Sequence, residues 1–384
     1  MEIRVLKENE RGKAAALWRY CFADAQEFID WYFTRRAGEV LAMMDGGALI
    51  AQIVCVPLSI SMRGAPRDTA MISGVATAPP ARGRGHMTGL IRESLAHLRS
   101  KQTSVAVLYP YEYSFYEQYG FAKCGEVAKV NAPISRMRAA KLMGEIIMLG
   151  GGADDNAMLA KAYEASFSRY SGRVLRDEPY FAMLLEELAQ DGGYGAVYRR
   201  DGAEKGYILY EMRDRVLSAK EIGAADNIAR QDMLGFICTH SSTMDTAEFV
   251  CPLEDPLWRL ISDPRDLVSA QPYAMFRIVD IEQAMNGIPA GDGMATLKVM
   301  DPYAPWNEGF WRFCAEDGMM VAERIEDPGF RNLPVLSIGA LTQWAFGSAD
   351  GSDLRRQGAL LSDVCMEAMD CLLPRRPVFI YEMY

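Results

Sequence analysis

Two arginines and two glycines form the part of this sequence whose residue types and spacing most clearly indicate a chemical role. Residues 75–90 read V-A-T-A-P-P-A-R-G-R-G-H-M-T-G-L. The pattern predicts a strand end, a turn with two prolines, a glycine-rich loop and a helix that begins near His86. Free N–H groups at a helix start, with Arg82 and Arg84 beside them, are suited to binding phosphate. The loop is neither a Walker loop nor a G-x-G-x-x-G turn, and an ordinary turn before a helix is the alternative interpretation.

An aromatic stretch lies one predicted helix downstream. Residues 105–109, V-A-V-L-Y, form a short apolar run typical of a buried strand, and P-Y-E-Y-S-F-Y-E-Q-Y-G-F follows over residues 110–121. A phenol with a pKa near ~10 is protonated at neutral pH and can donate a proton. Most tyrosines only pack with a hydrogen-bonded hydroxyl, so Tyr111, Tyr113 and Tyr119 are equally open to that structural interpretation.

Together the two stretches resemble the GNAT acetyltransferases. Arg82 and Gly85 match that family's Arg-x-x-Gly-x-Gly/Ala loop, whereas Met87 stands where Gly or Ala is usual. Residues 115–121 match its F-Y-x-x-x-G-F pattern. The resemblance implies a fold in which two neighbouring strands splay apart and acetyl-CoA lies in the gap between them.

The same resemblance implies the contacts to acetyl-CoA. Backbone groups of Val75, Ala76 and Thr77 would pair with the pantetheine arm. Tyr111 and Glu112 would flank the cofactor on its other side. The pyrophosphate would be held by the loop and the start of the helix, with His86 contributing only its backbone N–H: Arg82, Gly83, Arg84, Gly85, His86, Met87 and Thr88.

Composition limits the class of protein. A chain of 384 residues, half of them apolar, predicts two or three domains with ample core. No run of ~18 apolar residues and no signal peptide is present, so we expect a cytoplasmic protein without a membrane partner. Eight scattered cysteines without C-x-x-C and three isolated histidines argue against a metal site. The net charge of −10 argues against nucleic acid and suits a cationic partner.

The predicted order of elements occurs twice. The first copy ends with a strand that begins at residues 128–130, and aromatic residues of its first two helices are expected in the core, some of them lining an acceptor pocket. The expected elements are helices 11–23 and 26–35, strands 41–45, 48–56, 58–62 and 69–77, and helix 87–99, followed by helices 156–169 and 178–190, strands 195–199, 206–212 and 216–222, and helix 227–239.

The second copy lacks the phosphate-binding loop. It reads E-I-G-A-A-D-N-I-A-R at the corresponding junction, where Asp226 or Asn227 can cap the helix. An aspartate there repels phosphate, so we expect a second GNAT-like domain that does not bind acyl-CoA. The last ~100 residues alternate strands at 295–300, 310–315, 319–324 and 335–337 with helices at 338–346 and 354–369, which predicts an α+β unit.

The domain order is similar to that of the Eis (enhanced intracellular survival) family. P-Y-A-M-F-R-I-V-D-I (272–281), N-E-G-F-W-R-F (307–313) and L-S-I-G-A-L-T-Q-W-A-F-G (336–347) carry this resemblance. It implies a catalytic GNAT domain over 1–148, a degenerate one over 149–286 and a sterol-carrier-protein-like α+β domain over 287–384. It also implies an acetyl-CoA-dependent N-acetyltransferase of aminoglycosides or lysine side chains that forms a homo-oligomer, commonly a hexamer.

The Eis resemblance implies two catalytic groups. Tyr116 holds the position of the general acid, and the C-terminal carboxylate of Tyr384 holds that of the general base. The apolar run V-F-I-Y-E-M-Y is consistent with a terminus held inside the structure, and an ordinary closing strand is the alternative. Deprotonating an ammonium group of pKa near ~10 at pH 7 costs about 4 kcal/mol. Burial that raises the carboxyl pKa, or a relaying water, would ease the transfer.

The sequence does not identify the amine acceptor. Asp24, Glu27 and Glu382 are candidate contacts for an ammonium group, and Glu382 is also a candidate to share the role of base. A regulatory protein-lysine acetyltransferase is one alternative. A non-catalytic binder of acyl-CoA or an apolar ligand is the other, against which the intact Arg82/Gly85 loop argues.

Overall fold

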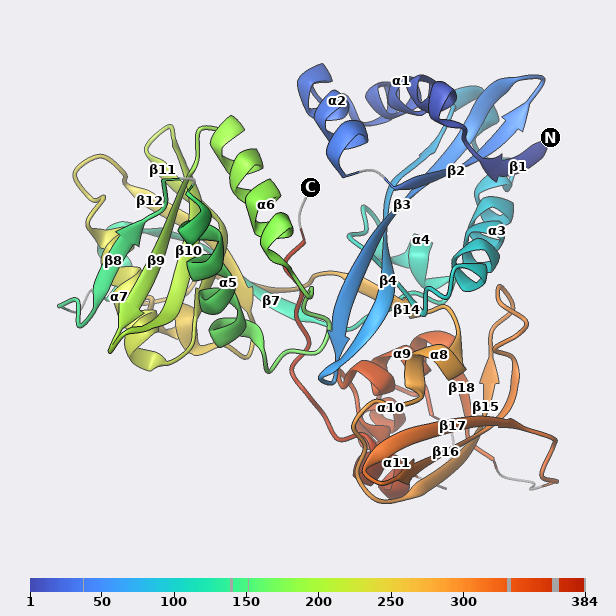
Figure 1. Cartoon of the computed structure of the whole chain (residues 1–384). Coiled ribbons are helices and arrows are strands. Elements are labelled where there is room, and N and C mark those ends of the chain that lie inside the picture. Colours follow the sequence, from blue (N-terminus) through green and yellow to red (C-terminus); the bar gives the residue numbers. More distant parts are fainter. Residues whose placement is uncertain (37, 139–140, 151, 330–332, 361–365, 383–384) are drawn as a thin grey trace. The chain divides into compact units, whose positions relative to one another are not determined.

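The computed structural model describes residues 1–36, 38–138, 141–150, 152–329, 333–360 and 366–382 (Figure 1). The chain forms two compact units. Unit 1 contains residues 1–124 and 274–376, and unit 2 contains residues 125–273 and 377–384. The chain therefore passes between the units three times.

Unit 1 begins with a mixed sheet in which β4 and β5 are the only parallel neighbours among the described strands. Residues expected as two strands, 48–56 and 58–62, are one long strand, because Pro57 is accommodated opposite Ala70. The sheet order is β1 (Glu2–Val5), β2 (Glu39–Asp45), β3 (Ala48–Met62), β4 (Ala65–Thr77), β5 (Val105–Leu108), β14 (Met275–Ile278) and β6 (Ala122–Lys123), with helices α1 (Arg11–Phe22), α2 (Gln26–Arg35), α3 (His86–Ser100) and α4 (Tyr113–Glu117).

Parallel strands β4 and β5 separate after a short contact. They pair from Thr69 to Met71, and in the described part of the chain β4 continues to Thr77 without a β5 partner. Apolar residues of both strands and of α3 form one core under this sheet, including Ile72, Leu90 and Leu108. The core fixes the strands below the point at which they splay.

The sheet of unit 2 repeats this arrangement. β11 and β12 are parallel and pair only over residues 216–218 of β11 among the residues that the structure describes. The order is β13 (Val268–Pro272), β7 (Glu126–Pro133), β12 (Thr246–Pro252), β11 (Val216–Ala224), β10 (Ala203–Arg213), β9 (Tyr194–Arg200) and β8 (Glu145–Met148), with helices α5 (Ala153–Phe167), α6 (Glu178–Gln190) and α7 (Asn227–Cys238).

The two sheets exchange a strand. β7 lies beside β12 in the second sheet, and β14 lies between β5 and β6 in the first. The expectation that residues 128–130 close the first sheet is therefore wrong. Alternating burial predicts that a segment is a strand but does not say which sheet it joins. The domain limits drawn from the sequence at residues 148 and 286 stay predictions.

The third sheet belongs to unit 1. Its order is β17 (Met319–Ile325), β16 (Gly309–Glu316), β15 (Met294–Met300) and β18 (Val335–Ser337), accompanied by α8 (Ile281–Met285), α9 (Ile338–Phe346), α10 (Gly351–Arg356) and α11 (Met366–Leu372). The helix expected over 354–369 is not continuous, because α10 ends at Arg356 and Gly358 adopts a left-handed φ of 72°. None of the described helices is long and apolar enough to span a membrane.

Candidate active site

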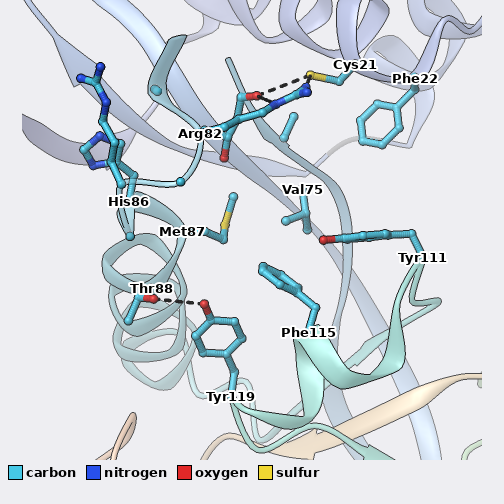
Figure 2. Close-up of a pocket in the computed structure, with 16 residues that line it drawn as sticks. Cys21, Phe22, Val75, Arg82, His86, Met87, Thr88, Tyr111, Phe115 and Tyr119 are labelled. Atoms are coloured by element: carbon cyan, nitrogen blue, oxygen red, sulfur yellow. Dashed lines mark hydrogen bonds between the residues drawn. The ribbon is translucent and has the colours of Figure 1, made fainter. Parts of the chain in front are cut away.

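The splay of β4 and β5 opens into a cleft of about 680 Å³ (Figure 2). All of its lining residues belong to unit 1. It contains eleven of the twelve residues expected to contact the cofactor: Val75, Ala76, Thr77, Arg82, Gly83, Arg84, Gly85, His86, Met87, Thr88 and Tyr111. The remaining lining residues are Cys21, Phe22, Ala81, Phe115 and Tyr119.

Two left-handed glycines shape the loop before α3. Gly83 and Gly85 have φ of 73° and 75°, which other L-residues rarely adopt. Gly85 is the N-cap of α3 and offers no side-chain acceptor to the first N–H groups of that helix. The positive end of the α3 dipole and these donors therefore face the cleft, which is the arrangement that binds a phosphate group.

Arg82 and His86 differ in their orientation. The Arg82 guanidinium turns toward the end of β4, where Nε donates to the Thr77 carbonyl at 2.9 Å and Nη2 contacts Cys21 Sγ at 3.5 Å. Figure 2 shows the His86 imidazole turned away from Met87 and Val75. That His86 contributes only its backbone N–H to cofactor binding stays a prediction.

Aromatic side chains form the opposite wall of the cleft. Tyr111, 76% exposed, and Phe115 face Met87 and Val75 across it (Figure 2). The Tyr119 hydroxyl lies 3.0 Å from Thr88 Oγ1 and shares a hydrogen bond with it. The motifs that predict the cofactor contacts do not include Tyr119. Its position four residues after Phe115, which also lines the cleft, is the signal in the sequence that could have found it.

Tyr116 does not line the cleft. Its side chain is only 4% exposed, and its ring contacts Tyr111, Phe115 and Phe121 with centroids 5.0–6.0 Å apart. With Val75, which also lines the cleft, it borders an apolar cavity of about 20 Å³. Burial raises the pKa of the Tyr116 hydroxyl, and the nearby Tyr111 adds to the rise. The hydroxyl is therefore protonated at neutral pH.

Three acidic residues expected at the site have other surroundings. Glu112 caps α4, where its carboxylate accepts from the Ser114 N–H at 3.3 Å, and it does not line the cleft. Asp24 accepts from Trp18 Nε1 at 2.7 Å. Glu27 lies exposed in the first turn of α2. Of the aromatic residues on the first two helices, Phe22 lines the cleft, whereas Trp18 and Tyr32 are buried.

Glu382 lies in unit 2 and is 1% exposed. Its carboxylate accepts a hydrogen bond from the Tyr180 hydroxyl and lies 4.0 Å from Arg176 Nη2. Residues 378–382, the described part of the apolar C-terminal run, are buried. The run is not a strand, because its described part makes only an isolated bridge between Val378 and Ser171. Tyr384 lies outside the described residues.

Comparison with known families assigns each part of the chain. Residues 2–124 and residues 172–278 each match families described as "Acetyltransferase (GNAT) domain", and together they cover more than half of the chain. Residues 281–381 match the "Sterol carrier protein domain". The protein is therefore a GNAT N-acetyltransferase with two GNAT domains followed by a sterol carrier protein domain.

A curated relative matches most of the chain, and solved structures superpose on all of it. An "Uncharacterized N-acetyltransferase" of Streptomyces avermitilis is 22% identical, and the match covers 86% of this chain and 87% of the relative. A probable N-acyltransferase of Enterococcus faecalis superposes with a TM-score of 0.88 at 22% identity over 100% of this chain and 99% of that one. Eis1 of Mycobacterium abscessus superposes with a TM-score of 0.78 at 20% identity over 100% of both chains. The fold is thus Eis-like.

Proposed function

We propose that the protein transfers an acetyl group from acetyl-CoA directly to a primary amine. The acceptor class is a polyamine-like or aminoglycoside molecule, or a lysine side chain. The observation that carries the proposal is the cleft in which the end of β4, two left-handed glycines and the uncapped start of α3 meet. These residues fit a pantetheine arm joined to a pyrophosphate, and acetyl-CoA would supply the activated acetyl thioester.

The chain's residues would move two protons in this reaction. The acceptor nitrogen forms a bond to the acetyl carbon, and the bond between that carbon and the CoA sulfur breaks. Tyr116 is proposed to give its hydroxyl proton to the leaving thiolate, and burial keeps the hydroxyl protonated at neutral pH. The C-terminal carboxylate of Tyr384 is proposed to take the proton that the ammonium group loses.

The first test is chromatographic detection of free CoA formed from acetyl-CoA with aminoglycosides, polyamines and lysine peptides. Turnover that depends on the amine supports the proposal, and the ranking of acceptors separates compact polycations from peptides. Chromatography avoids thiol reagents, which would label the protein's eight cysteines. Tight acetyl-CoA binding without turnover would point to a different acceptor, and absence of binding would contradict the assignment of the cleft.

The proposal has three further parts, of which the first follows from the Eis resemblance and the others from the sequence. They are a homo-oligomer, with a hexamer as the expected size, a cytoplasmic location, and contacts from Asp24, Glu27 or Glu382 to the acceptor ammonium group. Light scattering of the purified protein tests the first. Single substitutions of the three acids to the matching amides test the last through the KM of the acceptor.

A further inference from the structure

A loop of the sterol carrier protein domain contacts both walls of the cleft in unit 1. Residues 301–307, D-P-Y-A-P-W-N, follow β15 and are here called the junction loop. One wall of the cleft is the start of α3, and the other is the aromatic segment formed by α4 and the residues beside it. The junction loop and both walls belong to the same compact unit. The spacing of the walls decides whether a cofactor fits between them.

Two arginines of α3 reach the junction loop. The Arg92 guanidinium lies over the Tyr303 ring, 5.2 Å from its centroid, and the Arg99 guanidinium lies over the Trp306 ring at 5.0 Å. Arg99 Nε also donates to the Asp280 carboxylate at 2.8 Å. A guanidinium on an aromatic face is attracted through its charge and stacks through its plane. The helix whose start is proposed to bind pyrophosphate is therefore attached to the junction loop at two positions.

Tyr303 also contacts the opposite wall of the cleft. Its ring packs edge-on against the Tyr119 ring, with centroids 5.0 Å apart. The Tyr119 hydroxyl in turn shares a hydrogen bond of 3.0 Å with Thr88 Oγ1 near the start of α3. Tyr119 and Thr88 line the cleft, whereas Tyr303 lies behind it. One ring of the junction loop thus connects Arg92 on one wall with Tyr119 on the other.

A buried arginine holds the backbone at Tyr119. Arg277 on β14 is fully buried, and its Nε donates to the Tyr119 carbonyl at 2.8 Å while its Nη2 donates to the Asp301 carboxylate at 2.7 Å. Gly120 follows with a left-handed φ of 84°, and a Cβ there would meet Ile338 Cγ2 at 2.5 Å and Arg277 Nε at 3.2 Å. The turn after α4 therefore needs glycine, because it lies directly against Arg277.

Asp301, the first residue of the junction loop, uses both of its carboxylate oxygens. Oδ1 accepts from Arg277 and from the backbone N–H groups of Tyr303 and Ala304, at 3.3 and 3.1 Å, and Oδ2 accepts from Asn307 Nδ2 at 2.9 Å. Asp301 and Asn307 are buried. A buried polar network whose members are hydrogen-bonded is rigid. The network therefore fixes the shape of the junction loop and its distance from the Tyr119 carbonyl.

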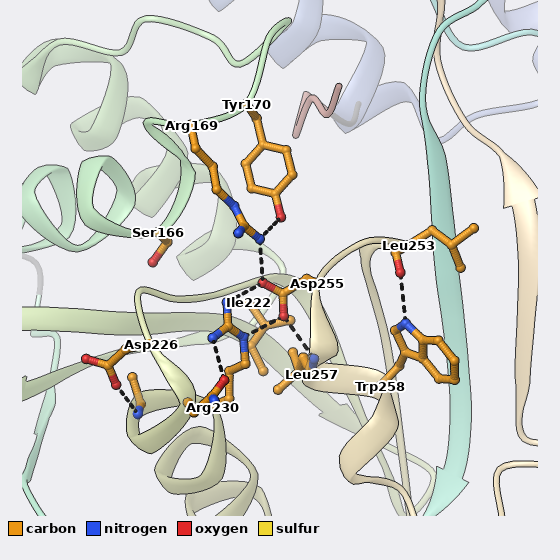
Figure 3. Close-up of polar contacts among 12 residues, drawn as sticks. Ser166, Arg169, Tyr170, Ile222, Asp226, Arg230, Leu253, Asp255, Leu257 and Trp258 are labelled. Atoms are coloured by element: carbon orange, nitrogen blue, oxygen red, sulfur yellow. Dashed lines mark hydrogen bonds and ion pairs between the residues drawn. The ribbon is translucent and has the colours of Figure 1, made fainter. Parts of the chain in front are cut away.

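In the second GNAT domain the corresponding elements contact each other directly (Figure 3). Arg230 on α7 donates through two bonds of 2.7 Å to Asp255, the N-cap of the short helix η4 (Pro256–Leu260). The Tyr381 hydroxyl also bonds to backbone groups of β11 and β12 and bridges their splay. The two domains thus differ in what joins the helix to the segment after the parallel strand.

We propose that the junction loop positions the two walls of the acetyl-CoA cleft, with Tyr303 and Arg277 as positioning residues that act through Tyr119. This inference rests on the proposed function, because it takes acetyl-CoA as the molecule between the walls. Walls that are already ordered lose little conformational freedom when a ligand binds, so loosening them weakens binding. The sterol carrier protein domain is then part of the cofactor site of the first GNAT domain.

The test replaces Tyr303 in the full-length protein, since replacing Arg277 would leave the buried Asp301 carboxylate without its cation. Tyr303→Leu keeps an apolar side chain and removes the ring between Arg92 and Tyr119. We expect the Kd for acetyl-CoA in calorimetry to rise at least about fivefold. Tyr303→Phe keeps the ring, so its Kd should stay within about twofold of the parent's.

A second variant makes the test independent of how well the first one folds. Trp306→Leu removes the ring under Arg99 and with it the other stacking contact between α3 and the junction loop. We expect the Kd for acetyl-CoA to rise at least about twofold. An unchanged Kd in the folded variants would overturn the inference.

Phe310→Leu is the matched control. Phe310 on β16 is half-buried like Tyr303 and has a cation over its ring, Lys298 at 5.6 Å, but it lies outside the junction loop and does not line the cleft. We expect this variant to keep the parent's Kd for acetyl-CoA. Circular dichroism melts give the stability of every variant. Equal rises of Kd in Phe310→Leu and Tyr303→Leu would assign the effect to general destabilisation and overturn the inference.

Hydrogen–deuterium exchange without acetyl-CoA separates the inference from the proposed function. We expect peptides covering residues 113–121 to exchange at least about threefold faster in Tyr303→Leu than in the parent protein or in Tyr303→Phe. Unchanged exchange, or faster exchange with an unchanged Kd, would overturn the positioning role and leave the proposed function standing. A parent protein that does not bind acetyl-CoA would overturn the proposed function, and the inference with it, whatever the exchange rates.

Discussion

In both GNAT domains the central parallel strands pair briefly and then separate, β4 from β5 after Met71 and β11 from β12 after Ser218. The first separation opens into a cleft lined by glycines, arginines and aromatic residues. The second is bridged by Tyr381. The fold supplies the same gap twice, and the residues around it decide whether a ligand or the chain's own end enters.

The two helix starts differ in their cap residue and in its backbone conformation. Gly85 caps α3 without a side chain, whereas Asp226 caps α7 with a carboxylate that also pairs with Arg200 at 2.7 Å. A carboxylate at this position uses a helix N–H and repels phosphate. The comparison therefore predicts which substitutions convert one type of helix start into the other.

The largest effect is expected from Gly85→Asp, which places a carboxylate at the start of α3, as Asp226 does at the start of α7. A Cβ at Gly85 meets no atom within 4 Å, and Asp and Asn are the non-glycine residues that best tolerate its left-handed φ. We expect the Kd for acetyl-CoA in calorimetry to rise at least ~100-fold, equivalent to about 2.7 kcal/mol. Gly85→Asn is the uncharged control, for which we expect the Kd for acetyl-CoA to rise less than tenfold. Equal losses in both variants would assign the effect to shape instead of charge.

Tyr116→Phe tests the proposed general acid of the first GNAT domain. We expect kcat to fall at least tenfold with the Kd for acetyl-CoA nearly unchanged, because the ring still packs and only the proton donor is lost. Tyr111→Phe and Tyr119→Phe are matched controls, since both hydroxyls belong to residues that line the cleft. A larger kcat loss in either control than in Tyr116→Phe would reassign the acid to that tyrosine.

A smaller effect is expected at Cys21, whose alkylation should slow about fivefold when acetyl-CoA is bound. Cys21 lines the cleft beside Arg82, so saturating acetyl-CoA should slow its alkylation by iodoacetamide, measured by peptide mass spectrometry. Exposed Cys371 should react equally with and without ligand. Cys55 and Cys124 should stay unmodified, because burial raises the pKa of both thiols to about 12. Unchanged Cys21 reactivity would place the cofactor elsewhere.

Below about pH 10, we expect no decline in kcat from deprotonation of Tyr116. An acid must be protonated to act, and its activity falls as the pH rises through its pKa. Burial raises the pKa of Tyr116 above its ordinary value near ~10, so this descending limb moves upward. The measurement is kcat at saturating acetyl-CoA from pH 6 to 10. A decline in the parent centred below pH 9 that disappears in Tyr116→Phe would contradict the direction of the shift.

The smallest effect is expected from Asp226→Gly. It removes the carboxylate from the α7 cap, but Tyr381 still bridges the splay and Arg230 remains paired with Asp255. We therefore expect calorimetry to give one acetyl-CoA per chain for both the parent protein and the variant. Binding of a second acetyl-CoA by the variant would show that the Asp226 cap alone prevents the second domain from binding this ligand.

Local patterns made most of the first site predictable. The spacing of Arg82, Gly83 and Gly85 before a helix fixed the loop, and its residues line the cleft as expected. Long-range partners were not predictable in the same way. The sequence of residues 126–133 does not indicate that they join the second sheet. The residues around Glu112 likewise do not indicate that its carboxylate caps its own helix. The missing information is tertiary, because one strand pattern fits either sheet.

The strand exchange has a consequence for how the protein is made. β5 has β14 as its neighbour on one side, and β14 is synthesised only after most of unit 2. At about 5–20 residues per second, a ribosome needs roughly ten to thirty seconds to travel from β6 to β14. During that time the buried strand Val105–Leu108 presents an open, apolar edge to the nascent chain's surroundings. The sheet that forms the cleft is therefore completed late in translation, although its strands β1 to β6 are synthesised before most of unit 2.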